Sequence, residues 1–151
     1  MSHVRKAVPG DLGQLVAMAR DFTGESALPL TFNREKSAHY LLWLIGQPAY
    51  DVLVEQDGDV ISGAAIVGYE AHWYDETCAY VEKMFVHKEF RGLGTARALV
   101  REIVLACQAR GAVIVFAAST AGMGERTEKL YVRLFERAGF TFLGRVMQRI
   151  L

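Results

Sequence analysis

The chain has 151 residues, of which 52% are hydrophobic and 11% aromatic, and its 17 Lys and Arg residues balance 17 Asp and Glu residues. This composition excludes a disordered segment and predicts a single compact domain over residues 1–151, with enough core to need no disulfide or metal staple. The formal net charge of zero excludes long-range attraction to nucleic acid or an anionic membrane, so an anionic ligand would have to be held locally.

The first half of the chain is typical of one strand, two helices and three further strands. Alternating apolar residues predict strands, and apolar residues at helical spacing predict helices. The expected elements cover residues 4–7, 12–23, 33–45, 50–55, 60–69 and 78–87. Asp11 is the expected N-cap of the first helix, and Asp57-Gly58 is the strongest hairpin signal in the chain.

The second half is expected to alternate helices with strands. A long helix follows residues 91–96, the uninterrupted apolar run 112–116 predicts a central strand covered on both faces, and a last helix ends at Gly139. Strands over 140–142 and 145–151 complete the order βααβββαβαββ. The predicted fold class is therefore α/β, with a mixed central sheet of about six or seven strands flanked by four helices.

One stretch combines a strand, a loop with Gly92 and Gly94, and the start of a helix. Backbone N–H groups and the positive end of the helix dipole converge at such a point, which suits a phosphate group. Lys88, Arg91 and Arg97 add local positive charge. The dinucleotide pattern GxGxxG fails because Arg97 occupies its third glycine position, and no Gly-Lys-Ser/Thr exists for a P-loop.

The residues Arg91-Gly92-Leu93-Gly94-Thr95-Ala96 match the Arg/Gln-x-x-Gly-x-Gly/Ala motif of the GCN5-related N-acetyltransferase (GNAT) superfamily, which the chain resembles. The element order also looks like that of this family, as does the Gly139-Phe140 pair after the last helix. The residues from Val81 onward resemble in particular the branch that acetylates small amines and polyamines. The resemblance implies a GNAT-like fold and direct transfer of an acetyl group from acetyl-CoA to a primary amine within a ternary complex.

The resemblance also implies which residues hold acetyl-CoA. The backbone of Phe85 and Val86 would lie along the pantetheine arm and the thioester. The pyrophosphate would be held by the backbone amides of Arg91, Gly92, Leu93, Gly94, Thr95 and Ala96. Physical chemistry agrees, because a strand that stops pairing with its neighbour exposes N–H groups that can stabilise charge on the thioester oxygen.

Glu82 is the expected general base, because the attacking amine must lose a proton either directly or through a water. Strand alternation places it on the same face as Tyr80, Met84 and Val86, largely apolar company that disfavours the charged carboxylate. Alternatively, Glu82 only pairs with a nearby base or binds a substrate ammonium group. Some family members place the base near Tyr80, although strand packing alone would explain that residue.

The family often supplies a general acid for the leaving thiol from a Tyr four residues before the Gly-Phe pair. Phe135 stands at that position here and cannot donate a proton. Tyr131, one helical turn earlier on the same face, is the expected substitute. The thiolate could also leave unaided, because its pKa lies near that of a free cysteine, roughly 8.5. A catalytically weak acyl-CoA-binding module therefore stays open as an alternative.

The favoured acceptor is a small cationic amine, with a protein lysine or N-terminal amine as the alternative. In the family, the acceptor site is walled by segments that correspond to residues 25–32 and 70–76, and both carry acidic and aromatic side chains suited to a cation. Trp73 would contact either the substrate or a dimer partner, and Trp43 is expected in the core or in a pocket wall.

The remaining expectations concern compartment and partners. Cys78 and Cys107 are each isolated in an apolar context, which favours a reducing compartment and argues against a metal site. Residues 1–6 lack an apolar signal region and no stretch approaches the ~18 apolar residues of a membrane span, so we expect a soluble cytoplasmic protein without membrane or nucleic-acid partners. A homodimer is left open, because residues 146–151 would suit strand pairing across an interface.

Overall fold

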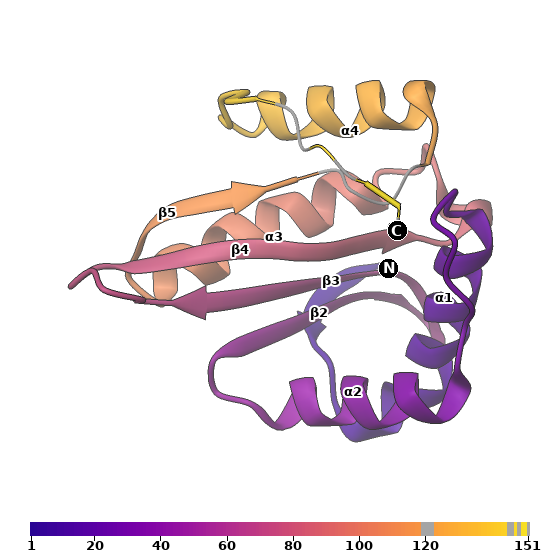
Figure 1. Ribbon diagram of the computed structural model, residues 1–151. Helices are drawn as coiled ribbons and strands as arrows, with labels where there is room; N and C mark the ends of the chain where they lie inside the picture. Colours follow the sequence, from indigo (N-terminus) through magenta and orange to yellow (C-terminus); the bar gives the residue numbers. More distant parts are fainter. Residues whose placement is uncertain (119–122, 145–146, 148, 151) are drawn as a thin grey trace.

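The computed structural model describes residues 1–118, 123–144, 147, 149 and 150. Within these residues, the chain forms one five-stranded sheet, four α-helices and two short 3-10 turns (Figure 1). The strands are β1 (His3–Lys6), β2 (Tyr50–Asp57), β3 (Val60–Glu70), β4 (Thr77–Val86) and β5 (Ala112–Ala117). The helices are α1 (Leu12–Glu25), α2 (Arg34–Gly46), α3 (Thr95–Ala109) and α4 (Glu125–Arg137), and the 3-10 turns are η1 (Pro9–Asp11) and η2 (Lys88–Phe90).

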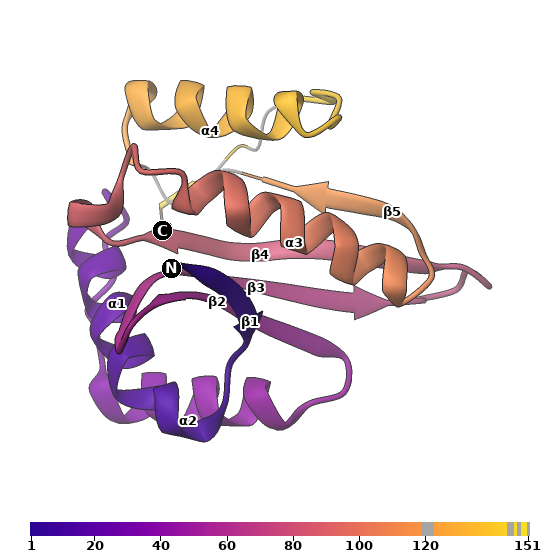
Figure 2. The ribbon, with the colours of Figure 1, turned by 180° about the vertical axis from the view of Figure 1, so that it is seen from behind.

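The described sheet runs in the order β1-β2-β3-β4-β5, with β4 and β5 parallel and the other neighbours antiparallel. Helices α1 and α2 cover one face and α3 covers the other, as the two opposite views show (Figures 1 and 2). Each face has its own core. The amphipathic helix α3 buries Leu99, Ile103 and Cys107 at helical spacing, whereas α1 and α2 pack against Val52 and Val54 of β2.

The described sheet has five strands rather than the six or seven expected, and the expected order with two strands after the last helix is not confirmed. Residues 140–142 form no regular structure, and the strand expected over 145–151 lies largely outside the described residues. β5 is an edge strand of the described sheet, with Val113 and Ile114 exposed, so the expected coverage on both faces is wrong. An apolar run in the sequence does not show whether helices will cover one face or both faces of the strand that it forms.

The first two helices begin in different ways. Asn33 caps α2, since its side chain accepts a hydrogen bond from the N–H of Lys36 at 2.9 Å. The carboxylate of Asp11 instead accepts hydrogen bonds from the guanidinium of Arg5 at 2.7 and 2.9 Å and from the N–H of Val8 at 2.8 Å. Asp11 is thus the N-cap residue of α1, as expected, but its side chain makes no capping hydrogen bond, because β1 places a charged donor beside this carboxylate.

A buried ion-pair network joins β1, β2, β3 and the end of α3. Asp51 is only 2% exposed and accepts hydrogen bonds from Arg110 at 2.8 and 3.0 Å and from the Tyr69 hydroxyl at 2.8 Å. The Nζ atom of Lys6 lies 2.6 Å from the same carboxylate. Burial opposes ionisation of Asp51, but the hydrogen bonds from these three partners outweigh it and hold its pKa below the usual value.

Asp51→Asn is expected to lower the free energy of unfolding by about 3 kcal/mol, because Arg110 keeps its charge and loses its partner. The folded-state pKa of Asp51 is lowered, so its contribution is present above the pKa of free Asp, about 3.9, and is lost as pH falls through the folded value. Urea unfolding at pH 7 and at lower pH measures both effects. The exposed Asp57→Asn is the control, and a fully stable Asp51→Asn would contradict the network's role.

Candidate active site

Strand β4 separates from β5 halfway along its length. Pairing with β5 runs from Thr77 to Val81, whereas pairing with β3 continues to Val86. In the described part of the chain, residues 82–86 therefore present a free backbone edge on the β5 side. N–H and C=O groups on such an edge can bind a ligand. Phe85 and Val86, the residues expected beside the thioester, lie on this edge.

The loop after β4 brings backbone N–H groups to one point. Gly92 has φ +84° and Gly94 has φ +102°, angles that residues with a side chain rarely adopt, so the loop depends on glycine. The first hydrogen bond of α3 runs from the N–H of Ala98 to the carbonyl of Gly94, at 3.0 Å. The N–H groups of residues 95–97 therefore have no acceptor within the helix and remain available to an anion.

A cleft of about 660 Å³ lies between the free edge of β4, this loop and α4. Most of the predicted site residues line it, namely Glu82, Phe85, Val86, Arg91, Gly92, Gly94, Ala96 and Tyr131. The side chains of Leu93 and Thr95 point elsewhere, since Leu93 is exposed to solvent and Thr95 is buried. Their expected contribution is through backbone amides. The N–H of Thr95 has no acceptor within the helix, whereas that of Leu93 donates to the carbonyl of Phe90 at 3.3 Å. The cleft therefore connects a helix N-terminus that can hold an anion with an open strand edge that can hydrogen-bond a ligand.

Part of the positive charge expected at the loop is neutralised. Arg91 pairs with Glu25, the last residue of α1, through hydrogen bonds of 2.8 and 3.0 Å, and Lys88 Nζ lies 3.8 Å from the same carboxylate. Arg91 also donates to the carbonyl of Val86 at 3.0 Å. These contacts hold the end of α1 against the end of β4.

Three other arginines bring positive charge to the cleft. Arg97 of α3 lines it together with Arg133 and Arg137 of α4, and none of the three forms an ion pair within the described ranges. Arg97 was expected from the sequence, whereas the two arginines of α4 were not. The sequence could have indicated them, because Arg133 and Arg137 are four residues apart, as are Leu130 and Leu134. This spacing places all four side chains along one side of the helix.

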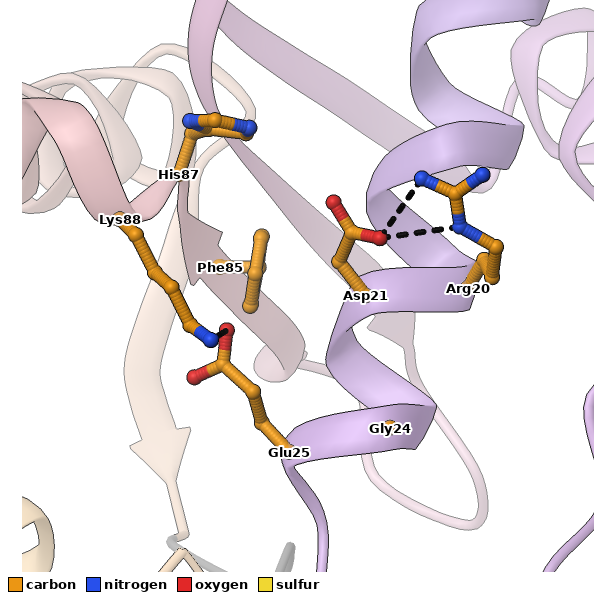
Figure 3. Close-up of a pocket in the computed structure, with 7 residues that line it drawn as sticks. All are labelled: Arg20, Asp21, Gly24, Glu25, Phe85, His87 and Lys88. Carbon is orange, nitrogen blue, oxygen red and sulfur yellow. Dashed lines mark hydrogen bonds and ion pairs between the residues drawn. The ribbon is translucent and has the colours of Figure 1, made fainter.

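A smaller pocket of about 440 Å³ lies beside the cleft, between α1 and the end of β4 (Figure 3). Its charged side chains pair with one another, Arg20 with Asp21 at 2.9 Å and Lys88 with Glu25. Phe85 lies between the two pairs (Figure 3). Of these two pairs, only Lys88–Glu25 joins α1 to the turn after β4, since Arg20 and Asp21 are neighbours within α1, and we assign no ligand to this pocket.

A β-bulge in β4 sets the direction of Glu82. The pairing register with β3 shifts between Ile66 and Val67, which leaves Glu82 as the extra residue of β4. Strict alternation, on which the sequence expectation depends, stops at this bulge. Met84 and Val86 consequently pack against the core under α3, and the expectation that they share a face with Glu82 is wrong.

The neighbours of Glu82 are tyrosines. A Cβ atom added to Gly68 would lie 2.9 Å from Glu82 Oε1 and 3.1 Å from the ring of Tyr50, so the carboxylate and the ring both lie over this glycine. The charge of Glu82 raises the pKa of Tyr50, with further increases from burial and from Glu70. Burial, followed by the charge of Glu82, raises the pKa of Tyr40. Glu82 thus lines the cleft on one side and lies near the side chains of Tyr40 and Tyr50 on the other.

Tyr131 lines the cleft from α4. Its hydroxyl lies 3.5 Å from the carbonyl oxygen of Ala118, and burial raises its pKa to about 12, so the phenol keeps its proton at neutral pH. Phe135 is 4% exposed and packs edge-on against Phe140 in the core. A tyrosine at position 135 would therefore be buried, whereas Tyr131 presents its side chain to the cleft.

The two segments expected to wall the acceptor site lie at opposite ends of the long strands. Glu25 and Leu28 line the cleft. Residues 71–76 form the turn between β3 and β4, at the end of the sheet remote from α1, and do not line the cleft (Figures 1 and 2). Trp73 in this turn is 85% exposed, and Trp43 is 49% exposed, so Trp43 is not a core residue.

Three further findings limit the chemistry of the described residues. None of the helices in the described ranges has the length and apolarity needed to cross a membrane. Within the same ranges, no group of His, Cys, Asp or Glu side chains is placed to hold a metal ion. Cys78 and Cys107 are both buried and unpaired.

A family model described as the acetyltransferase (GNAT) family matches residues 16–140. The chain therefore belongs to the GNAT acetyltransferases, which take their acetyl group from acetyl-CoA, and the resemblance seen in the loop motif is confirmed. A search of curated proteins found no similar sequence.

Three solved structures resemble the chain over nearly its whole length. One is a transcriptional regulator from Bacillus halodurans C-125, at 18% identity over 100% of both chains and a TM-score of 0.81. Another, described as a predicted acetyltransferase with acetyl-CoA from Clostridium acetobutylicum, has 16% identity over 99% of this chain and 96% of that chain, with a TM-score of 0.76. The third is an aminoglycoside acetyltransferase from an uncultured soil metagenomic sample in complex with sisomicin, at 14% identity over 99% and 95% of the chains and a TM-score of 0.75. At these identities the likeness establishes the fold alone.

Proposed function

We propose that the protein transfers an acetyl group from acetyl-CoA to a primary amine, directly and within one ternary complex. The observation that carries this proposal is the cleft, which brings together the free edge of β4, the amides of the glycine loop, a carboxylate and a phenol. Amide formation from a thioester needs groups that hold the donor and a proton acceptor for the amine, and a proton donor assists the departing thiol.

Acetyl-CoA supplies the activated acetyl group, and three parts of the chain would hold it. Within the expected residues 91–96, the N–H groups of Arg91 and Leu93 already donate to the carbonyls of Lys88 and Phe90, so those of Gly92, Gly94, Thr95 and Ala96 would bind the pyrophosphate. Arg97, Arg133 and Arg137 would assist them. The free backbone edge at Phe85 and Val86 would bind the pantetheine arm and donate a hydrogen bond to the thioester oxygen. These contacts would orient the thioester toward Glu82.

Glu82 would take the proton that the amine must lose, directly or through a water. The amine nitrogen bonds to the carbonyl carbon, the carbon–sulfur bond breaks, and the sulfur gains a proton. Tyr131 would give that proton, because it lines the cleft and its phenol, with a pKa of about 12, is protonated at neutral pH. The two side chains line the same cleft from β4 and from α4.

A small cationic amine is the acceptor that we favour over a protein lysine or N-terminus. Glu82 and Glu70 both act electrostatically on Tyr50, and no Lys or Arg forms an ion pair with either carboxylate in the described part of the chain. Glu70 Oε2 lies 2.6 Å from His72 Nε2, so Glu82 is the one of the two carboxylates without a basic partner in the described residues, and its negative charge beside tyrosine faces suits an ammonium group. The test is acceptor-dependent release of CoA thiol across amines and lysine peptides. Release with peptides alone would reverse this preference, and no release with any acceptor would favour an acyl-CoA-binding module.

Tyr131→Phe is expected to lower kcat about tenfold, because the leaving thiolate loses its proton donor but has a pKa of roughly 8.5 and can leave unaided. Acetyl-CoA affinity, measured by calorimetry, should stay at the wild-type value. The matched variant adds Phe135→Tyr to Tyr131→Phe, which supplies a phenol at the family's usual position but inside the core. Restored turnover in the double variant would contradict the assignment of Tyr131.

Three broader expectations also stay proposals: that residues 1–151 form one transferase domain, that the protein works in the cytoplasm, and that it forms a homodimer. The two buried, unpaired cysteines support a reducing compartment. Size-exclusion chromatography with light scattering tests the oligomeric state.

A further inference from the structure

Gly68 leaves the space in which the Glu82 carboxylate lies. A Cβ atom at this position would be 2.9 Å from Glu82 Oε1, closer than real Cβ atoms come to their neighbours. Gly68 lies within β3 and its φ is not in the left-handed region, so its backbone conformation does not require glycine. The absence of a side chain at Gly68 therefore serves the position of the carboxylate.

Two tyrosines lie near the same carboxylate, Tyr40 of α2 and Tyr50 of β2, and Trp43 packs against both. Trp43 stacks on Tyr40 with ring centroids 6.2 Å apart and packs against Tyr50 at 5.6 Å. Burial, followed by the charge of Glu82, raises the pKa of Tyr40. Trp43, although half exposed, thus holds two phenols beside one carboxylate.

We propose that Gly68 is a positioning residue for Glu82: the absence of a side chain there admits the carboxylate beside the cleft, next to the ring of Tyr50. This inference rests on the proposed function, since it concerns the same proton transfer. Gly68 itself does not line the cleft. A base must lie within hydrogen-bond reach of the proton it removes, and a misplacement of about 1 Å can cost on the order of 10²-fold in rate. Gly68 therefore affects turnover through Glu82.

Gly68→Ala tests the inference. The atom that the new methyl group displaces most is the end of the flexible Glu82 side chain, and the Tyr50 ring, 3.1 Å from the added Cβ, has to shift by a few tenths of an ångström. We expect kcat at neutral pH to fall about tenfold, with unchanged acetyl-CoA affinity and a folded protein by circular dichroism. The matched control Gly13→Ala adds the same methyl group where nothing lies within 4 Å of it and should leave kcat unchanged.

A double-mutant cycle separates positioning from a general structural effect. If Gly68 acts through Glu82, adding Gly68→Ala to Glu82→Gln lowers kcat no further. Wild-type kcat in Gly68→Ala, or full additivity in the double variant, would overturn the inference. If Glu82→Gln has a low kcat in the same experiment, the proposed role of Glu82 stands even when the inference about Gly68 fails. The failure of the inference and the failure of the proposed function are therefore distinguishable.

An NMR titration of carbon-13-labelled tyrosines gives a readout independent of turnover. The charge of Glu82 raises the pKa of Tyr50, so Glu82→Gln should lower that pKa. Gly68→Ala should also change it, because the carboxylate moves. An identical Tyr50 titration in wild type and Gly68→Ala would overturn the inference, even if no acceptor were turned over.

Discussion

Gly94→Trp is expected to abolish acetyl-CoA binding without unfolding the protein. Gly94 is the residue before α3, and the nearest atom to an added Cβ is Arg97 Nη2 at 3.9 Å, so an indole meets no core residue there. The indole would occupy the point where the N–H groups of residues 95–97 converge and would exclude phosphate from it. In calorimetric titrations we expect micromolar binding to the wild type and no detectable binding to the variant.

The control variant must also introduce a side chain at a glycine with positive φ, but at a position away from the phosphate loop. Gly94 has φ +102°, and a side chain at such an angle costs of order 1–3 kcal/mol. Gly111, beyond the opposite end of α3, has φ +71° and no atom within 4 Å of an added Cβ. Gly111→Trp should therefore bind acetyl-CoA like the wild type. Wild-type binding by Gly94→Trp would contradict the assignment of the glycine loop.

Glu82→Gln is expected to lower kcat by about 10²-fold while acetyl-CoA affinity stays the same. Glutamine is similar in size and can keep the contacts over Gly68, but it cannot take a proton at neutral pH. The deficit should shrink as pH rises, because more of the amine is then already neutral. Steady-state kinetics over a pH series, with calorimetry for acetyl-CoA, measure the two quantities separately.

The exposed carboxylate of Glu76, in the turn between β3 and β4, provides the matched control. Glu76→Gln makes the same chemical change away from the cleft and should leave kcat unaltered. Equal turnover by Glu82→Gln and the wild type would remove Glu82 as the base. A parallel loss of acetyl-CoA affinity would instead indicate that Glu82 supports the donor site.

The glycine loop was predictable from the sequence because its structure is local. The left-handed angles at Gly92 and Gly94 and the start of α3 at Thr95 depend on residues adjacent in the chain. The family was predictable for the same reason, since its motif lies in this loop and the family match over 16–140 confirms it.

The direction of Glu82 could not be predicted, because a β-bulge depends on the register between two strands. Alternation along β4 is correct up to Val81 and fails after it, which moves Met84 to the opposite face. The pairing of Arg91 with Glu25 is equally non-local, since 66 positions separate the two residues. The contacts of Trp43 with Tyr40 and Tyr50 likewise depend on how α2 packs beside β2.

Direct transfer in a ternary complex is the central claim, and an initial-rate study that varies acetyl-CoA and an amine together tests it most directly. We predict double-reciprocal lines that intersect, and no acetylated protein after incubation with acetyl-CoA alone. Parallel lines, together with an acetyl group on Cys78 or any other residue in the absence of amine, would contradict direct transfer and indicate a covalent intermediate.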